Sequence, residues 1–352
     1  MAGTDLGDVA DLFRVLAEID FHPGSLYERL ARAAADDPEV LSLLLPAAPR
    51  DRLPHLLFAA AQYLLLGEGS DPLAAFGDEP YETFRAWCLG RRDELAGLVA
   101  THVVQTNEVA RCAGLLPCLA AVGAASPDRP LAIVEVGASA GLNLLFDRYR
   151  YDYGGGHQAG PASSPVVIRP EILGGERDQR VLDLRVPGVA WRRGLDRRPV
   201  DVTDDDAVRW LRSCIWPEEA ARRRLLEQAV SVARRTGPPA VVAGDAVDGL
   251  ADVVASAPPD ATVCVIHTAF ISYLPDPAAF VQRMARVAED RPLWWVSGEP
   301  AGFVPQLSGP STRDGRIAFL YGAVPLGIPG HEPRAFATAG PHVTWLDWVD
   351  QH

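Results

Sequence analysis

The segment from Gly137 to Gly141, Gly-Ala-Ser-Ala-Gly, holds residues whose types and spacing could carry out chemistry in two ways. A G-x-S-x-G sequence at a sharp turn between a strand and a helix presents its serine as a nucleophile. The same small residues let the backbone approach a nucleotide closely, with the N–H groups of the next helix turned toward it. Both interpretations need a strand before Gly137 and a helix that opens near Leu142. They differ in whether Ser139 reacts or only fills the turn.

The serine-hydrolase interpretation requires several strands before the nucleophile and an oxyanion loop from an earlier strand. The residues before Ser139 show helical patterns instead and contain no HGGG sequence. The strand that ends at Val136 is therefore expected to be the first of its sheet, which favours the nucleotide cradle. A dinucleotide loop, G-x-G-x-x-G, is matched less well, because Ser139 and Leu142 stand at its second and third glycine positions. A serine hydrolase, a dinucleotide-dependent oxidoreductase and a non-catalytic nucleotide-binding protein remain as alternatives.

Acidic residues stand at the ends of three expected strands. Glu135 closes the strand before the loop, Asp196 ends "AWRRGLD", and Asp245 ends "PAVVAGD". A carboxylate at the end of the second strand can accept hydrogen bonds from both hydroxyls of a ribose, typically ~20 residues after the loop. An insertion at about residues 151–190 would explain why Asp196 lies farther from Gly141. At Asp196 and Asp245 the aspartate could instead cap the following helix.

Longer stretches, "VQTNEVARCAGLLP", "VEVGASAGLNLLFDRYRYDYG", "VIHTAFISYLP" and "WWVSGEP", give the chain a resemblance to known proteins. The order of its parts resembles the class I S-adenosylmethionine-dependent methyltransferases. Nearly the whole chain is also similar to an uncharacterised bacterial family, a domain of unknown function. The resemblance implies a Rossmann-like α/β fold and S-adenosyl-L-methionine as cofactor, with Asp245 contacting the adenine amino group, but it implies no substrate. The loop and strand-end residues expected at the cofactor are Glu135, Gly137, Ala138, Ser139, Gly141, Asp196 and Asp245.

The segment "QTNEVAR" before the first strand adds three polar residues. Asn107 and Glu108 lie four and three positions before Arg111, so on the expected helix they share a face. The apolar flanks "HVV" and "CAGLLP" indicate that this face turns inward. In the class that the chain resembles, this segment covers the methionine end of the cofactor, so Arg111 could pair with its carboxylate. The alternative is a solvated Glu108–Arg111 pair, worth only ~0.3–0.5 kcal/mol.

Candidate catalytic residues follow the later strands. His267 comes after "ATVCVI", at a strand end of the kind that forms the ligand crevice in open α/β sheets. A histidine there can act as a general base near neutral pH, or it can be a capping or core residue. Tyr273 lies in the same "HTAFISY" segment, and Glu299 ends "LWWVSGE". We predict that His267, Tyr273 and Glu299 face a methyl acceptor, and that His331 and His342 lie in turns or at the surface.

Two regions with different patterns of apolar residues are expected to position these residues. Residues 1–125 show apolar residues three and four apart, which predicts a helical N-terminal cap domain. From residue 126 to 352, short β-branched runs alternate with helical segments, which predicts a mainly parallel sheet. "RIAFLYGAV" and "VTWLDWV" would close the sheet as antiparallel strands. Within the insertion, "VVIRPEI" and "VLDLRV" could form a small hairpin beside it.

Composition excludes several classes of function. The 352 residues carry a formal net charge of −13, which argues against nucleic-acid and membrane-surface partners and leaves a small-molecule substrate. All 33 basic residues are arginine, so a Schiff-base lysine and a Walker A lysine are excluded. The five cysteines form no C-x-x-C pair and the histidines no metal-ligand spacing, so no metal is expected. With no signal-peptide pattern at the N-terminus, we expect a cytoplasmic protein; the sequence does not indicate an oligomeric state.

Overall fold

The computed structural model describes residues 6–76, 79–173, 184–313 and 315–349. The chain divides into two compact units. Residues 1–106 and 204–223 form the first unit, and residues 107–203 and 224–352 form the second. The predicted domain boundary after residue 125 coincides with the end of helix α8 (Cys112–Ala125), and this helix is grouped with the second unit.

The first unit contains only helices among its described residues. They are α1 (Leu6–Ile19), α2 (Leu26–Ala34), α3 (Pro38–Leu41), α4 (Pro54–Gly67), α5 (Pro72–Ala75), α6 (Pro80–Gly90), α7 (Arg92–Thr101) and α10 (Asp205–Ser213), with 3-10 turns η1 (Ser42–Leu44) and η2 (Pro49–Asp51). α4 is buried on most of its surface, as its apolar sequence predicts. Gln62 of α4 donates from Nε2 to the carbonyls of Ser213 and Ile215 (3.2 and 2.8 Å), which ties α10 to helices far earlier in the chain.

The segment "QTNEVAR" is not the helix that we predicted. Residues 102–108 have no regular structure, and Asn107 and Glu108 precede a 3-10 turn, η3 (Val109–Arg111). Glu108 caps this turn, since its Oε1 accepts a hydrogen bond from the Ala110 N–H (3.3 Å). α8 begins only at Cys112, directly after η3, and Arg111 at its N-cap position makes no capping hydrogen bond with its side chain.

A nine-stranded sheet forms the second unit, in the order β5-β14-β13-β12-β9-β8-β1-β6-β7. Its strands are β1 (Leu131–Val136), β5 (Glu171–Leu173), β6 (Val189–Asp196), β7 (Val241–Ala243), β8 (Thr262–Thr268), β9 (Leu293–Pro300), β12 (Phe319–Leu326), β13 (Arg334–Ala339) and β14 (Trp345–Trp348). β7, β6, β1, β8 and β9 run parallel. β12 runs antiparallel to β9, β13 to β12 and β14 to β13, whereas β5 runs parallel to β14. The mainly parallel sheet is confirmed, with three antiparallel strands at its C-terminal side.

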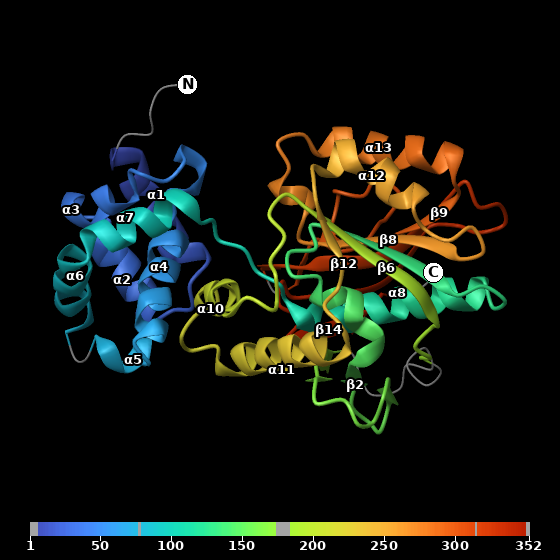
Figure 1. Ribbon diagram of the computed structural model, residues 1–352, viewed down its shortest axis with the longest axis horizontal. Helices are drawn as coiled ribbons and strands as arrows, with labels where there is room; N and C mark the ends of the chain where they lie inside the picture. Colours follow the sequence, from blue (N-terminus) through green and yellow to red (C-terminus); the bar gives the residue numbers. More distant parts are fainter. Residues whose placement is uncertain (1–5, 77–78, 174–183, 314, 350–352) are drawn as a thin grey trace. The chain divides into compact units, whose positions relative to one another are not determined.

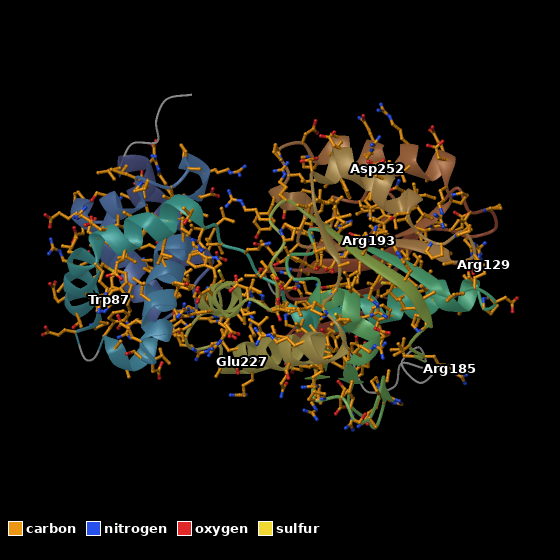
Figure 2. The ribbon with its side chains drawn as sticks, in the orientation of Figure 1. Trp87, Arg129, Arg185, Arg193, Glu227 and Asp252 are labelled. Atoms are coloured by element: carbon orange, nitrogen blue, oxygen red, sulfur yellow. The ribbon has the colours of Figure 1, made fainter. Side chains whose placement is uncertain are left out.

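Helices cover both faces of the sheet (Figure 1). α12 (Ala246–Ala255) and α13 (Pro277–Asp290) lie on one face, where they pack on alternate residues of β1, β8 and β9 in a common apolar core. Figure 2 labels Arg193 on β6 and Asp252 on α12, and Arg193 reaches Ser256 at the end of that helix (Nη1–Oγ 3.4 Å). α8 lies on the opposite face. Because successive residues of a strand point to opposite faces, neighbours such as Val134 and Glu135 belong to different surroundings.

The insertion after β1 is bound tightly to the second unit. Its strands β2 (Arg150–Asp152), β3 (Gln158–Ala159) and β4 (Val167–Ile168) form a small sheet of their own. The predicted hairpin is wrong for "VVIRPEI", which divides between β4 and the large-sheet strand β5, and "VLDLRV" lies partly outside the described residues. The buried hydroxyls of Tyr149, Tyr151 and Tyr153 donate to the carbonyls of Leu142, Phe146 and Ala113 (2.7, 2.7 and 2.9 Å).

The remaining elements are α11 (Ala220–Thr236), η4 (Leu142–Arg148), η5 (Ile271–Tyr273) and a short pair, β10 (Thr312–Arg313) and β11 (Arg316–Ile317). In the described ranges, no helix has both the length and the apolar character needed to cross a membrane. All five cysteines are buried and unpaired.

Candidate functional site

The order of the parallel strands reverses at β1, because β6 and β7 follow on one side of it and β8 and β9 on the other. In open α/β sheets, ligands bind outside the carboxyl ends of the strands at such a point. The turn from Gly137 to Gly141 leaves β1 there, with positive φ angles of 71° at Gly137, 53° at Ser139 and 70° at Gly141. A Cβ atom at Gly137 would lie 2.5 Å from the Phe270 ring, so this position has no room for a side chain.

The element after the turn differs from the prediction. We expected a helix whose first N–H groups face a ligand, but η4 is a seven-residue 3-10 segment with non-helical angles at Leu145. The Leu142 N–H donates to Asn107 Oδ1 (3.0 Å) and is therefore occupied within the protein. The turn is thus held from outside by Asn107, and no free helix N-terminus contributes to the site.

Asp196 lies where the second parallel strand was predicted to end, at the carboxyl end of β6. Its Oδ2 accepts a hydrogen bond from the Ser139 N–H and its Oδ1 one from the Arg198 N–H, both at 2.8 Å. Each carboxylate oxygen has more than one acceptor position. Asp196 therefore joins the end of β6 to the turn that follows β1.

Asp245 serves as a helix cap. The third strand, β7, ends two residues earlier, at Ala243, and Asp245 Oδ1 accepts hydrogen bonds from Val247 and Asp248 at the start of α12 (2.8 and 3.4 Å). Its Oδ2 accepts from Arg197 Nη2, and this bond lowers the pKa of Asp245. Both oxygens of Asp245 are thus bound to protein donors, as are both oxygens of Asp196, but those of Asp245 serve the start of α12 and an arginine side chain.

Glu135 is buried on the α8 face of the sheet. Its Oε1 accepts a hydrogen bond from Asn143 Nδ2 (3.0 Å), whereas its Oε2 has no hydrogen-bond partner within the described ranges. Burial raises the pKa of Glu135 to about 8, although the Asn143 bond and the charge of Arg111 oppose the rise. A carboxyl group with this pKa can hold or release a proton near neutral pH. Asn143, a polar residue within "GLNLL", was missed from the sequence, although its apolar neighbours marked it as buried.

Arg111 reaches the same edge of the sheet from η3. Its Nε donates to the Pro341 carbonyl (3.0 Å) and its Nη1 to the Thr268 carbonyl at the end of β8 (3.5 Å), and the guanidinium lies over the Phe319 ring. Arg111 is only 8% exposed. The alternative, a solvated Glu108–Arg111 pair, is not found: Arg111 is buried, and Glu108 Oε2 lies 3.4 Å from His342 Nδ1.

Tyr321 of β12 is a further polar residue at this edge, and nothing in its sequence spacing connected it with the loop. It pairs with Gly298 of β9, and its ring fills the space beside Gly298 and beside Gly114 of α8. Its hydroxyl has no hydrogen-bond partner among the residues that the structure describes, although the side chain is fully buried. The α8 face thus gathers Arg111, Glu135 and Tyr321.

His267 and Glu299, which we predicted to face a methyl acceptor with Tyr273, lie on the other face of the sheet from Arg111, Glu135 and Tyr321. His267 Nε2 accepts a hydrogen bond from Trp295 Nε1 (2.7 Å), and because an indole N–H only donates, the imidazole is neutral with its proton on Nδ1. That proton is donated to Glu299 Oε1 (2.8 Å), which also accepts from the Phe270 and Ile271 N–H groups. With both ring nitrogens in use and no exposed surface, His267 has no lone pair for an acceptor.

The other predicted site residues also lie in different surroundings. Tyr273 is 81% exposed and belongs to no buried cluster. Ser139 is buried, and its hydroxyl has no partner in the described part of the chain, so no histidine activates it there. Ala138 is also buried, beside Gly194 of β6.

Comparison with known proteins identifies the family. The chain belongs to a family described as uncharacterized protein conserved in bacteria (DUF2332), whose model matches residues 10–348. No curated protein and no solved structure matches the chain.

Proposed function

We propose that this member of the family binds S-adenosyl-L-methionine and transfers its methyl group to a small molecule. The observation that carries the proposal is Asp196, a carboxylate at the end of the second parallel strand that is hydrogen-bonded to the glycine turn after the first strand. In Rossmann-like folds a carboxylate at this position binds the ribose hydroxyls of a nucleotide. The formal charge of −13 supports a small-molecule acceptor over a nucleic acid.

The strand order supports a Rossmann-like fold. Numbered along the chain, the parallel strands β7, β6, β1, β8 and β9 lie in the order 3-2-1-4-5, which begins the order of doubly wound nucleotide-binding sheets. The glycine turn follows the first strand, at the point where that order reverses. This arrangement would expose the turn and Asp196 to one ligand.

The site residues would divide the cofactor between them. Gly137 and Gly141 would let the backbone approach it, Asp196 would accept hydrogen bonds from its ribose, and Arg111 would bind its carboxylate. The cofactor supplies an electrophilic methyl group on a sulfonium, and the protein mainly positions the acceptor in line with it. If the acceptor loses a proton, Glu135 is the buried carboxyl group at this edge that can take it, in place of His267.

A serine hydrolase is the second candidate, and the backbone of Ser139 favours it. Its φ of 53° is a strained conformation for a residue that is not glycine, as in a nucleophile elbow. Against this, the hydroxyl is buried and receives no hydrogen bond from a histidine among the described residues. The turn also follows the first strand of the sheet instead of a later one.

Calorimetry with S-adenosylhomocysteine tests the proposal. We expect the wild-type protein to bind it and Asp196→Asn to weaken binding by about tenfold or more, because an amide cannot accept from two ribose hydroxyls while its NH₂ faces backbone donors. Asp201→Asn is the matched control, since Asp201 is exposed and binds only Thr203 in its vicinity. This variant should bind like the wild type.

Three outcomes would contradict the proposal. Saturating S-adenosylhomocysteine that gives neither heat nor a rise in melting temperature would exclude the cofactor, because a ligand that binds the folded state stabilises it. Heat with NAD instead would favour an oxidoreductase. Stoichiometric labelling by a fluorophosphonate that is lost in Ser139→Ala would put the hydrolase first.

A further inference from the structure

The ring of Tyr321 is held in a place built for it. A Cβ at Gly114 of α8 would lie 2.5 Å from the ring, and a Cβ at Gly298 of β9 would also overlap with it. Tyr321 faces Gly298 near the carboxyl end of β9, so the ring stands at the edge of the sheet where the glycine turn also lies. Two glycines thus make room for a large side chain at this edge.

The hydroxyl of Tyr321 differs from those of the other buried tyrosines of the second unit. Tyr149, Tyr151 and Tyr153 each donate to a backbone carbonyl, whereas the Tyr321 hydroxyl has no partner in the described part of the chain and no exposed surface. Buried tyrosine hydroxyls normally find a hydrogen-bond partner, and an unpaired one lowers stability. Its missing partner is therefore expected to come from a ligand.

Arg111 gives the chemical class of that ligand. Its two hydrogen bonds to carbonyls use two of its five N–H donors, and within the described ranges no carboxylate lies at ion-pair distance from it. A buried charge is costly without a counter-ion. Arg111 lies over Phe319, which is two residues from Tyr321 on the same strand and hence on the same face.

We propose that Tyr321 and Arg111 together bind the carboxylate of the amino-acid end of S-adenosylmethionine, with Tyr321 as a binding residue in addition to the loop and Asp196. This inference rests on the proposed function. A phenol O–H and a guanidinium both donate, and a carboxylate is the planar anion that a guanidinium binds through two hydrogen bonds. Arg111 and Tyr321 also influence each other electrostatically: burial raises the pKa of the Tyr321 hydroxyl, and the positive charge of Arg111 opposes this rise.

The test compares Tyr321→Phe with Tyr153→Phe, the same change at a buried tyrosine whose hydroxyl is bonded. Two probes are used, S-adenosylhomocysteine and methylthioadenosine, which lacks the amino-acid end. We expect Tyr321→Phe to weaken S-adenosylhomocysteine binding by about tenfold and to leave methylthioadenosine binding unchanged, because only the first ligand brings a carboxylate. Without ligand, Tyr321→Phe should keep or raise the melting temperature, and Tyr153→Phe should lower it.

Each other outcome has a definite meaning. Tyr321→Phe that leaves S-adenosylhomocysteine binding unchanged, or weakens both ligands equally, overturns the inference while the proposed function stands. If neither ligand binds the wild-type protein, the proposed function fails and the assignment of this carboxylate fails with it. A Tyr321→Phe variant that loses as much thermal stability as Tyr153→Phe shows that the hydroxyl has a protein partner, and this also overturns the inference.

Discussion

The two faces of the sheet hold their buried polar side chains differently at the carboxyl edge of the parallel strands. On the α12–α13 face, His267, Trp295 and Glu299 form a chain of hydrogen bonds, and Glu299 Oε1 accepts three of them, although Glu299 Oε2 has no partner among the described residues. On the α8 face, the Tyr321 hydroxyl makes no hydrogen bond and Glu135 is bonded through Oε1 alone, within the part of the chain that the structure describes.

The difference separates groups that stabilise the fold from groups that remain available for a ligand. A buried polar group with all its partners inside the protein contributes to folding and has nothing left to offer. A buried polar group without a partner destabilises the protein, so we expect that its partner comes from outside the chain, for example from a bound ligand. By this criterion the bonded pair of His267 and Trp295 belongs to the fold, whereas the Tyr321 hydroxyl on the α8 face is the group for which we propose a ligand.

Of the changes that test this comparison of the two faces, His267→Ala should have the largest effect on the free energy of unfolding. Removing the imidazole leaves the Trp295 N–H without an acceptor, takes one donor from Glu299, and opens a cavity beside Phe280. Unpaired buried groups and a cavity together should lower the free energy of unfolding by about 3–5 kcal/mol, measured by urea denaturation.

The control for His267→Ala is His331→Ala, the same change at an exposed position, with an expected effect within about 0.5 kcal/mol. The folded His267→Ala protein should bind S-adenosylhomocysteine normally. A variant that keeps its stability but loses turnover would instead return His267 to a catalytic role.

Glu135→Gln should change the free energy of unfolding less than His267→Ala does, and it should raise this free energy instead of lowering it. The folded pKa of about 8 lies above the unfolded value near 4.3, so the folded state holds the proton more tightly. Stability from this group is therefore fully present below about pH 4 and is lost as the pH rises toward 8. Relative to the wild type, the glutamine variant should gain about 2–4 kcal/mol between pH 5 and pH 8.

Urea unfolding of both proteins at the two pH values measures this gain, because all other titrating groups are common to them. A constant difference between Glu135→Gln and the wild type across this range would mean that Glu135 is already ionised in the folded protein. Glu135 would then no longer support the contrast between the two faces of the sheet.

The sequence could predict the strands and their ends, but not the faces. Apolar runs followed by Glu135, Asp196, His267 and Glu299 located the carboxyl edge correctly, because the pattern of a buried strand is local. Which face each residue takes depends on the register of a single strand, so one position separates Val134 from Glu135 and the core from the site. His267 and Glu299 were therefore predicted at the right edge, but the sequence did not indicate that they lie on the opposite face from Glu135.

Other features depended on contacts that no local pattern contains. Tyr321 comes near the site only because β12 pairs with β9 and because Gly114 and Gly298 leave room for its ring. The helix expected after Gly141 became a 3-10 segment, since Tyr149 and Tyr151 bind the carbonyls of Leu142 and Phe146 and Asn107 takes the Leu142 N–H. These hydrogen bonds join residues from different elements, which periodicity cannot show.

The smallest effect concerns Asp245, which lies at the start of α12 and outside both polar clusters. Its carboxylate caps the helix and binds Arg197. Asp245→Ala should lower the free energy of unfolding by about 1 kcal/mol, because losing a helix cap usually costs this much. Asp245→Ser keeps a capping oxygen and loses only a partly exposed ion pair, so it should lower the free energy of unfolding by less than about 1 kcal/mol. Asp204→Ala, which removes the cap of α10, is the matched control for the first change.

Since both oxygens of Asp245 already serve the protein, Asp245→Ser should bind S-adenosylhomocysteine and methylthioadenosine within about twofold of the wild type, a difference of less than about 0.5 kcal/mol. Equal weakening of both ligands, which share the adenine, would show that Asp245 contacts the base, and a ligand site would then extend beyond the α8 face.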